Sequence, residues 1–166
     1  LQYQSKVNMF TGDVICVEAL IRWQHPDRGL VQPLEFLPII EGHAFSLEVG
    51  EWVIGTALAQ INQWQSMAIN LPISVNISAY QLQQDNFHTR LATLLAAHPE
   101  VDPYSLELEI LETSELSDIN RVSATMDACH ALGVRFALDD FGTGYSSLTH
   151  LRRLPAYLIK VDQSFE

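Results

Sequence analysis

The chain has 166 residues, 48% of them hydrophobic, so it is long enough to bury a sizeable core, and its length favours a single domain. Its 20 acidic and 9 basic residues give a net charge of −11, which argues against a protein that grips long nucleic acids, because their phosphates need a basic surface. No apolar run reaches the length of a membrane span and no signal-peptide pattern is present, so we expect no direct membrane contact from this segment.

The first half of the chain predicts a hairpin, two helices and a further strand. Residues 1–8 and 13–23 are strand-like and are separated by Thr11-Gly12, a typical hairpin turn. A short helix is expected over residues 33–41, and a strand over residues 71–78. Between them a long helix is expected over residues 47–64, where apolar residues recur at helical spacing, namely Val49, Trp52, Val53, Ala57, Ile61 and Trp64.

The second half alternates regularly between strand and helix patterns. Strands are expected over residues 105–111, 134–141 and 156–162, and helices over residues 86–98, 119–133 and 146–154. The helix over residues 119–133 is expected to end at Gly133 as its C-cap, a position where glycine commonly terminates helices. This alternation predicts a parallel sheet of βα units, either open or closed into a barrel.

Polar residues recur on one face of each predicted strand, mostly late in the strand. An α/β barrel carries its chemistry at the carboxyl ends of its strands, so these side chains are expected to converge. A half-buried sheet with one solvated face gives the same alternation, although the intervening helices disfavour it. The residues expected to meet are Glu18, Asn76, Glu109, Asp139 and Lys160, with a further polar row at Gln2, Gln4 and Lys6.

Three carboxylates and an amide are hard oxygen ligands, which favour Mg²⁺ or Mn²⁺. Asp140 follows Asp139 directly, so one strand end can serve two cations, an arrangement that suits in-line attack on a phosphodiester. Lys160 can orient a water at this site or help to deprotonate it, and Arg22 can hold a phosphate through two hydrogen bonds.

Two further expectations concern residues outside this site. Cys16 and Cys129 lack metal or redox spacing, so both are interpreted as reduced thiols in or near the core of a cytoplasmic protein. Trp52 and Trp64 lie on the apolar stripe of the long helix, so they are expected in the core rather than in a base-stacking surface.

Several motifs, in order and spacing, carry a family resemblance: "VEALIRW", "QHPDRGLVQPLEFLPIIE", "GEWVI", "SVNIS", "LELEILETS", "ALDDFGTGYSSLTHLRRLP" and "IKVDQSF". The chain resembles, over essentially its whole length, the EAL domain of cyclic-di-GMP phosphodiesterases. This resemblance implies a TIM-type barrel with one antiparallel strand. It also implies hydrolysis of cyclic di-GMP to linear pGpG with Mg²⁺ or Mn²⁺, most often as two ions.

The resemblance also implies roles for individual residues. Lys160 matches the lysine that contacts the catalytic water, and Glu112 matches the glutamate that steadies the loop after the paired aspartates. Gln4 and Arg22 match substrate-contacting positions. Ser5 and Leu111 depart from the usual family residues without removing a ligand. The positions that match metal ligands are Glu18, Asn76, Glu109, Asp139 and Asp140.

Residues 1–166 are expected to be a partial EAL domain, because the family continues beyond "KVDQSF" with two further strands and another catalytic glutamate. We therefore expect little hydrolysis by this segment alone. Open barrel edges would favour a homodimer or a domain-swapped assembly. Two alternatives stay open: a cyclic-di-GMP receptor without catalysis, and a non-catalytic signalling or dimerisation module. The parent chain can also hold a nucleotide-cyclase or sensor domain.

Overall fold

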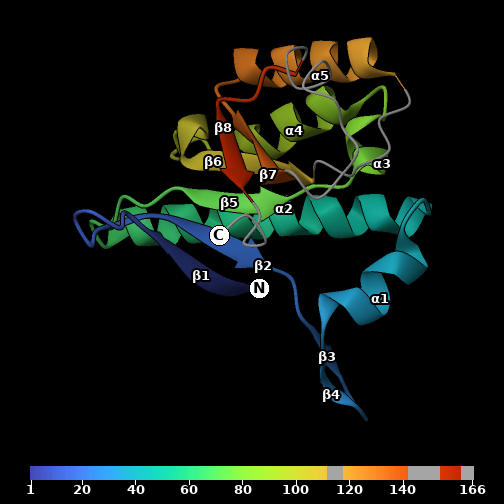
Figure 1. The fold of residues 1–166 in the computed structure, drawn as a ribbon, viewed down its shortest axis with the longest axis horizontal. Coiled ribbons are helices and arrows are strands. Elements are labelled where there is room, and N and C mark those ends of the chain that lie inside the picture. Colours follow the sequence, from blue (N-terminus) through green and yellow to red (C-terminus); the bar gives the residue numbers. More distant parts are fainter. Residues whose placement is uncertain (112–117, 142–153, 162–166) are drawn as a thin grey trace.

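The body of the protein is one curled six-stranded sheet with helices on one of its faces (Figure 1). The structure is a computed structural model that describes residues 1–111, 118–141 and 154–161. Neighbouring strands follow the order β1-β2-β5-β6-β7-β8. The strands of this sheet are β1 (Gln2–Val7), β2 (Val14–Leu20), β5 (Ile73–Asn76), β6 (Leu106–Leu111), β7 (Arg135–Phe141) and β8 (Leu158–Val161).

β1 pairs antiparallel with β2, and every later pair in the sheet is parallel. Parallel neighbours require long crossovers, and helices lie in the described crossovers from β2 to β5, from β5 to β6 and from β6 to β7. Among the described residues, β1 and β8 form the two edges of a half-barrel. The predicted α/β fold with one antiparallel strand is therefore confirmed, as a barrel that is not closed. The helical elements are α1 (Pro33–Ile40), α2 (Ala44–Ser66), α3 (Ala79–Leu82), α4 (Phe87–Ala96), α5 (Ile119–Ala131) and the short 3₁₀ turn Pro103–Ser105.

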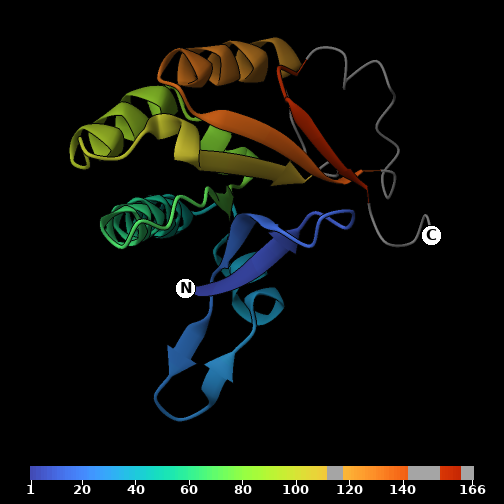
Figure 2. The same ribbon diagram turned by 90° about the vertical axis from the view of Figure 1, so that its left-hand side faces the viewer.

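The core lies between the sheet and the helices α2, α4 and α5, which stack side by side along the sheet (Figure 2). Apolar residues of one strand parity face these helices, as the alternation predicts. Burying each large apolar side chain stabilises the fold by about 1.5–3 kcal/mol. The central strands contribute Ile73, Val75, Leu106, Leu108, Ile110, Phe136 and Leu138, and the helices contribute Val53, Ile54, Ala57, Leu58, Ile61, Phe87, Leu91, Val122, Met126 and Cys129.

Local signals fix the two ends of α5. The Asp118 carboxylate accepts hydrogen bonds from the backbone N–H groups of Asn120 and Arg121, which caps the first turn. Gly133 follows the helix with a φ of +94°, and a Cβ there would lie 3.2 Å from Pro103. Both the left-handed backbone and the close approach require glycine, which confirms the predicted helix end.

The predicted strand over residues 13–23 is divided in the structure. β2 ends at Leu20, and a separate hairpin forms from β3 (Trp23–His25) and β4 (Gly29–Val31). Nδ1 of His25 accepts hydrogen bonds from the backbone N–H groups of Asp27 and Arg28, which closes the turn of the hairpin. The hairpin projects away from the sheet (Figure 1).

The prediction that Trp52 lies in the core is wrong, because this residue is 52% exposed. The buried face of α2 is centred instead on Ile54 and Leu58, which the assumed stripe left out. Trp64 is partly buried, with its ring 5.3 Å from that of Tyr3. The helix expected over residues 146–154 falls almost wholly outside the described residues.

Cys16 and Cys129 are both buried and free, as predicted. Burial raises the pKa of the Cys129 thiol to about 12. The cytoplasmic location that their reduced state suggests stays a prediction. No helix in the described part of the chain is long and apolar enough to cross a membrane.

The pairing of β7 with β8 is irregular at one point. Ala137 and Leu138 pair with Leu158 and Ile159, but the next partners are Phe141 and Val161. The register therefore shifts at the paired aspartates.

Candidate functional site

Strand register places the polar residues on the face of the sheet opposite the helices. Gln4 lies directly across from Glu18 in the antiparallel pair of β1 and β2. Asn76 lies across from Glu109, and Asp139 lies across from Leu111, two residues beyond Glu109 on β6. The prediction that these polar residues share one face of the sheet is therefore confirmed by the strand register.

Three carboxylates from three different strands meet on this face. Oxygen atoms of Glu18 in β2, Glu109 in β6 and Asp139 in β7 all lie within 4.8 Å of one another. Nζ of Lys160 in β8 lies 2.7 Å from Oε2 of Glu109, 2.5 Å from Oδ2 of Asp139 and 3.5 Å from Oε2 of Glu18. We call these four residues and Asn76 the mouth cluster.

Asn76 joins the mouth cluster through Glu18. Its Nδ2 donates a hydrogen bond of 2.9 Å to Oε1 of Glu18. Asn76 is the last residue of β5 and is exposed, so its side chain stands at the open end of the sheet.

The charges of the mouth cluster stabilise one another. Burial alone would raise the pKa of Glu109, but hydrogen bonds from Lys160 and Lys6 and the charges of both lysines lower it below its ordinary value. For Lys160, burial would lower the pKa, but hydrogen bonds to Asp139 and Glu109 and the nearby carboxylates raise it. In this arrangement Glu109 is a carboxylate and Lys160 is an ammonium ion at neutral pH.

The composition of the mouth cluster fits a divalent cation with hard oxygen preference. Its donors are carboxylate oxygens and one amide, and their spacing lets a single ion reach several of them. Lys160 occupies the centre of the three carboxylates, so it neutralises part of the charge that a cation would otherwise meet.

A second polar layer lies on the same face, nearer the amino ends of the strands. Nζ of Lys6 donates to Oγ of Ser74 at 2.7 Å, bonds Oε1 of Glu109, and lies 3.6 Å from Oε1 of Glu107. The Tyr157 hydroxyl donates to Oε2 of Glu107, whose residue is only 2% exposed. The members of this floor layer are Lys6, Ser74, Glu107, Arg135 and Tyr157.

Arg135 completes the floor layer beside Tyr157. Its guanidinium carbon lies 4.1 Å from the ring centre of Tyr104 and 4.7 Å from that of Tyr157, which are cation–π distances. Burial and the hydrogen bond to Glu107 raise the pKa of Tyr157. The sequence placed Lys6 in a polar row without a role. It placed Tyr157 inside the strand expected over residues 156–162, on the opposite parity from Lys160, whereas β8 begins only at Leu158.

The remaining predicted site residues lie in different surroundings. Gln4 is exposed on β1 beside Glu18. Arg22 follows β2 and donates from Nη1 to the carbonyl oxygen of Ile21 at 2.8 Å, and within the described residues no hydrogen bond or ion pair joins it to the mouth cluster. Asp140 belongs to β7. Glu112 lies outside the described residues.

One mainly apolar cavity of about 380 Å³ adjoins the mouth cluster at Asn76. Its walls come from the end of β2, from α1 and α2, and from the segment after β5. Ile21 and Leu37 are among the apolar residues that line it, and Ser78 adds a hydroxyl group. A flat apolar ring system attached to a polar group would match this combination.

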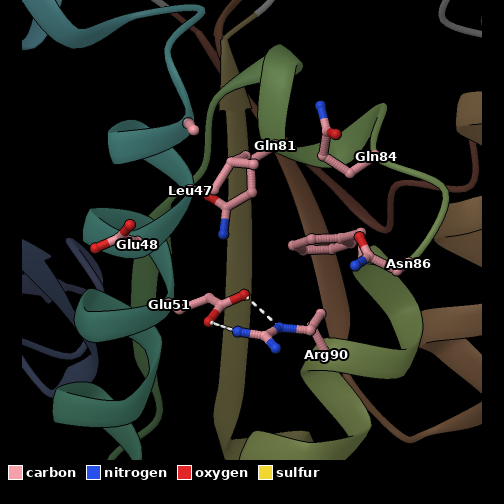
Figure 3. Close-up of a pocket in the computed structure, with 9 residues that line it drawn as sticks. Leu47, Glu48, Glu51, Gln81, Gln84, Asn86 and Arg90 are labelled. Atoms are coloured by element: carbon pink, nitrogen blue, oxygen red, sulfur yellow. Dashed lines mark hydrogen bonds and ion pairs between the residues drawn. The ribbon is translucent and has the colours of Figure 1, made fainter.

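A smaller pocket of about 220 Å³ lies among the helices α2, α3 and α4 (Figure 3). Arg90 bridges to Glu51 across it through two hydrogen bonds, one of them 2.7 Å long. The two charged groups therefore satisfy each other, and no member of the mouth cluster lines the pocket.

Comparison with known proteins agrees with this geometry. Residues 1–165 match the sequence model of the EAL domain. Cyclic di-GMP phosphodiesterase PA2567 of Pseudomonas aeruginosa is 41% identical over 165 residues, which are 99% of this chain and 28% of that protein. Cyclic di-GMP phosphodiesterase PdeR of Escherichia coli is 37% identical over 165 residues, which are 99% of this chain and 25% of that protein.

The fold is also similar to solved structures. The structure described as the PaMucR phosphodiesterase in complex with c-di-GMP superposes with a TM-score of 0.90 and 38% identity, covering 98% of this chain and 66% of that one. The resemblance inferred from the motifs is confirmed. The chain spans about a quarter of the length of these two curated relatives.

Proposed function

The chain belongs to the EAL domain family, and on that premise we propose that it supplies the main part of the active site of a metal-dependent phosphodiesterase that hydrolyses cyclic di-GMP to linear pGpG. The observation that carries the proposal is the meeting of Glu18, Glu109 and Asp139 from three strands within 4.8 Å. Relatives named as cyclic di-GMP phosphodiesterases and a related structure in complex with c-di-GMP support the substrate.

Each ligand role follows from position. Carboxylates of Glu18, Glu109 and Asp139 would hold Mg²⁺ or Mn²⁺, with Oδ1 of Asn76 as a neutral donor, because Nδ2 already bonds Glu18. Asp140 would serve a second ion beside Asp139. When bound, the cations neutralise the phosphate of the substrate and make water more acidic.

Lys160 would orient the attacking water by donating hydrogen bonds. As an ammonium ion held by carboxylates, it is poorly suited to accept a proton and well suited to fix positions. Glu112 would steady the loop that follows the paired aspartates.

Substrate contacts are proposed on both sides of the mouth cluster. Gln4 lies beside Glu18 on the edge strand and can hydrogen-bond the substrate. Arg22 would release the carbonyl of Ile21 and bind a phosphate, since a guanidinium matches phosphate geometry. The cavity beside Asn76 would take one guanine ring between its apolar walls.

The test uses a protein chain that contains residues 1–166 with its natural flanking sequence. We expect conversion of cyclic di-GMP to pGpG, measured by chromatography, only with Mg²⁺ or Mn²⁺ present. Glu18→Gln should abolish turnover, whereas Arg28→Gln in the distant β3–β4 hairpin should leave it unchanged. Tight binding of cyclic di-GMP without turnover would instead support a receptor.

The chain is further proposed to act as one domain of a larger cytoplasmic signalling protein, with residues 1–166 forming part of an EAL domain. A relative of Pseudomonas aeruginosa named as a bifunctional diguanylate cyclase/cyclic di-GMP phosphodiesterase is 39% identical over 166 residues, which supports a cyclase partner domain. The edge strand β8 exposes Leu158, Ile159 and Val161 at 38%, 39% and 62%. Such an edge favours pairing with further strands, from the same protein or from a second copy, and light scattering distinguishes a monomer from a dimer.

A further inference from the structure

Lys6 in β1 is a partly buried charged residue that the proposed function does not use. We propose that Lys6, held by Ser74, is a positioning residue that fixes the Glu109 carboxylate so that one of its oxygens faces the metal site. This inference rests on the proposed function, because it concerns how the same site is built.

The two oxygens of Glu109 have different partners. Oε1 accepts a hydrogen bond from Lys6, and Oε2 accepts one of 2.7 Å from Lys160. Lys160 also contacts Glu18 and Asp139, so Oε2 lies on the side of the mouth cluster, and Oε1 lies on the side of the floor layer. The Glu109 side chain is fully buried, so no water competes for Oε1.

Ser74 fixes the position of the Lys6 ammonium group. Its Oγ accepts from Nζ at 2.7 Å, and Ser74 is fully buried in β5. Oε1 of Glu107 lies 3.6 Å from the same nitrogen and has no hydrogen-bond partner in the described residues. Three oxygens from two neighbouring strands thus surround one ammonium group, whose long side chain would otherwise occupy many rotamers.

The consequence concerns the geometry of the proposed ligand. With Lys6 in place, Oε1 is occupied and the carboxylate plane is set, which leaves Oε2 to bind a cation through one oxygen. Without Lys6, the carboxylate can rotate or turn Oε1 toward the cation. Groups that orient a ligand in this way commonly change metal affinity by about 10–100-fold.

A simple charge effect predicts the opposite sign. Lys6 is a cation near the site, so its electrostatic repulsion alone would weaken the binding of Mn²⁺. Removing it would then tighten Mn²⁺ binding, whereas loss of positioning would weaken it. Ser74→Ala separates the two effects further, because it removes the anchor of Lys6 and leaves every charge unchanged.

The experiment measures the Mn²⁺ dissociation constant by calorimetry in the natural chain that contains residues 1–166. Lys6→Met, Ser74→Ala and the double variant are compared with the wild type. Ser5→Ala is the matched control, because this serine is exposed on the same strand as Lys6. Thermal unfolding without metal verifies that each variant is folded.

We expect the Mn²⁺ dissociation constant to rise about 10-fold in Ser74→Ala and at least as much in Lys6→Met. The double variant should match Lys6→Met alone, since Ser74 acts through the lysine. For cyclic di-GMP, kcat should fall in both variants while KM stays near the wild-type value.

Tighter Mn²⁺ binding in Lys6→Met, or unchanged binding in Ser74→Ala, would overturn the positioning role. If the losses of Mn²⁺ affinity in Ser74→Ala and Lys6→Met add up in the double variant, Ser74 does not act through Lys6, and this part of the proposal is overturned. If Lys6→Met does not fold, Ser74→Ala still decides the question. A wild type that binds no Mn²⁺ and hydrolyses nothing would instead refute the proposed function, which is a separate outcome.

Discussion

The mouth cluster and the floor layer occupy the same face of one sheet, yet their charges are balanced differently. In the mouth cluster, Lys160 forms ion pairs with three carboxylates, and of these only Glu109 also pairs with a second lysine, Lys6. In the floor layer, the only carboxylate is that of Glu107. It lies near Lys6 and accepts a hydrogen bond from the hydroxyl group of Tyr157. Arg135 adds another positive charge beside Tyr157.

This difference separates a cluster whose excess carboxylates suit a cation from a layer whose one carboxylate already has partners. Carboxylates that outnumber their cations repel one another, and an added divalent ion relieves that repulsion. A buried carboxylate with a lysine and a hydroxyl needs no added ion, and losing either partner leaves it unsatisfied. Substitutions of the mouth-cluster carboxylates and of Tyr157 should therefore affect different measurements, whereas Lys6 and Ser74 connect the floor layer to Glu109.

The largest effect is expected for Asp139→Asn in the mouth cluster. Loss of this charge should lower turnover of cyclic di-GMP more than about 100-fold, which exceeds the usual effect of residues that only orient ligands. Without metal, the free energy of unfolding should change by about 1 kcal/mol or less, because Lys160 keeps two other carboxylates. Chemical denaturation in EDTA measures this change, and a large loss of stability would contradict the division between the layers.

Metal binding should stabilise the fold only through the mouth cluster. At a free Mn²⁺ concentration 100 times the dissociation constant, the free energy of unfolding should rise by about 2.7 kcal/mol. Tyr157→Phe should retain this gain, whereas Asp139→Asn should lose it. Denaturation curves with and without Mn²⁺ give the comparison, and an equal gain in both variants would show that the ion binds elsewhere.

Tyr157→Phe should act on stability instead. Its hydroxyl is a partner of the buried Glu107 carboxylate, so its removal should cost about 1–3 kcal/mol of unfolding free energy. Mn²⁺ affinity should stay unchanged. Tyr3→Phe offers a matched control, because the Tyr3 ring packs against Trp64 of α2, on the helix-covered side of the sheet. A weaker affinity for Mn²⁺ in Tyr157→Phe would mean that the floor layer shapes the metal site more widely than through Lys6.

The smallest effect concerns acid pH and Glu109. Because its pKa is lowered in the folded state, ionised Glu109 contributes stability above its unfolded pKa of about 4.3 and loses that contribution as pH falls through the folded value. The stability advantage of the wild type over Glu109→Gln should therefore be largest at neutral pH and shrink below pH of about 4.3. Urea denaturation in EDTA across this range tests the sign, and an advantage that grows on acidification would refute it.

Much of the fold and of the mouth cluster follows from strand parity. Alternation in β5 and β6 assigned Asn76 and Glu109 to the polar face, and register brought them together. The break after Leu20 was not predictable, because the alternation of apolar and polar residues continues through Ile21, Arg22 and Trp23. That break depends on the β3–β4 hairpin, whose turn is closed by a histidine ring.

The floor layer was harder to predict than the mouth cluster. Parity placed Lys6 and Glu107 on the same face, but alternation does not show how far a long side chain reaches across strands. The contact of Lys6 with Glu109 joins residues 103 positions apart in sequence. β1 and β6 are separated by two strands, so the curl of the sheet brings these residues together, and no local pattern in a single strand encodes that curl.

The register shift between β7 and β8 has a consequence for how the strand end behaves. A regular ladder would bind each successive residue of β7 to its neighbour and hold the two aspartates as rigidly as the core. Where the ladder skips, the peptide units of Asp139 and Asp140 are less constrained by β8. The end of β7 is therefore tied less regularly to β8 than the apolar pairs before it, which keep the two strands together.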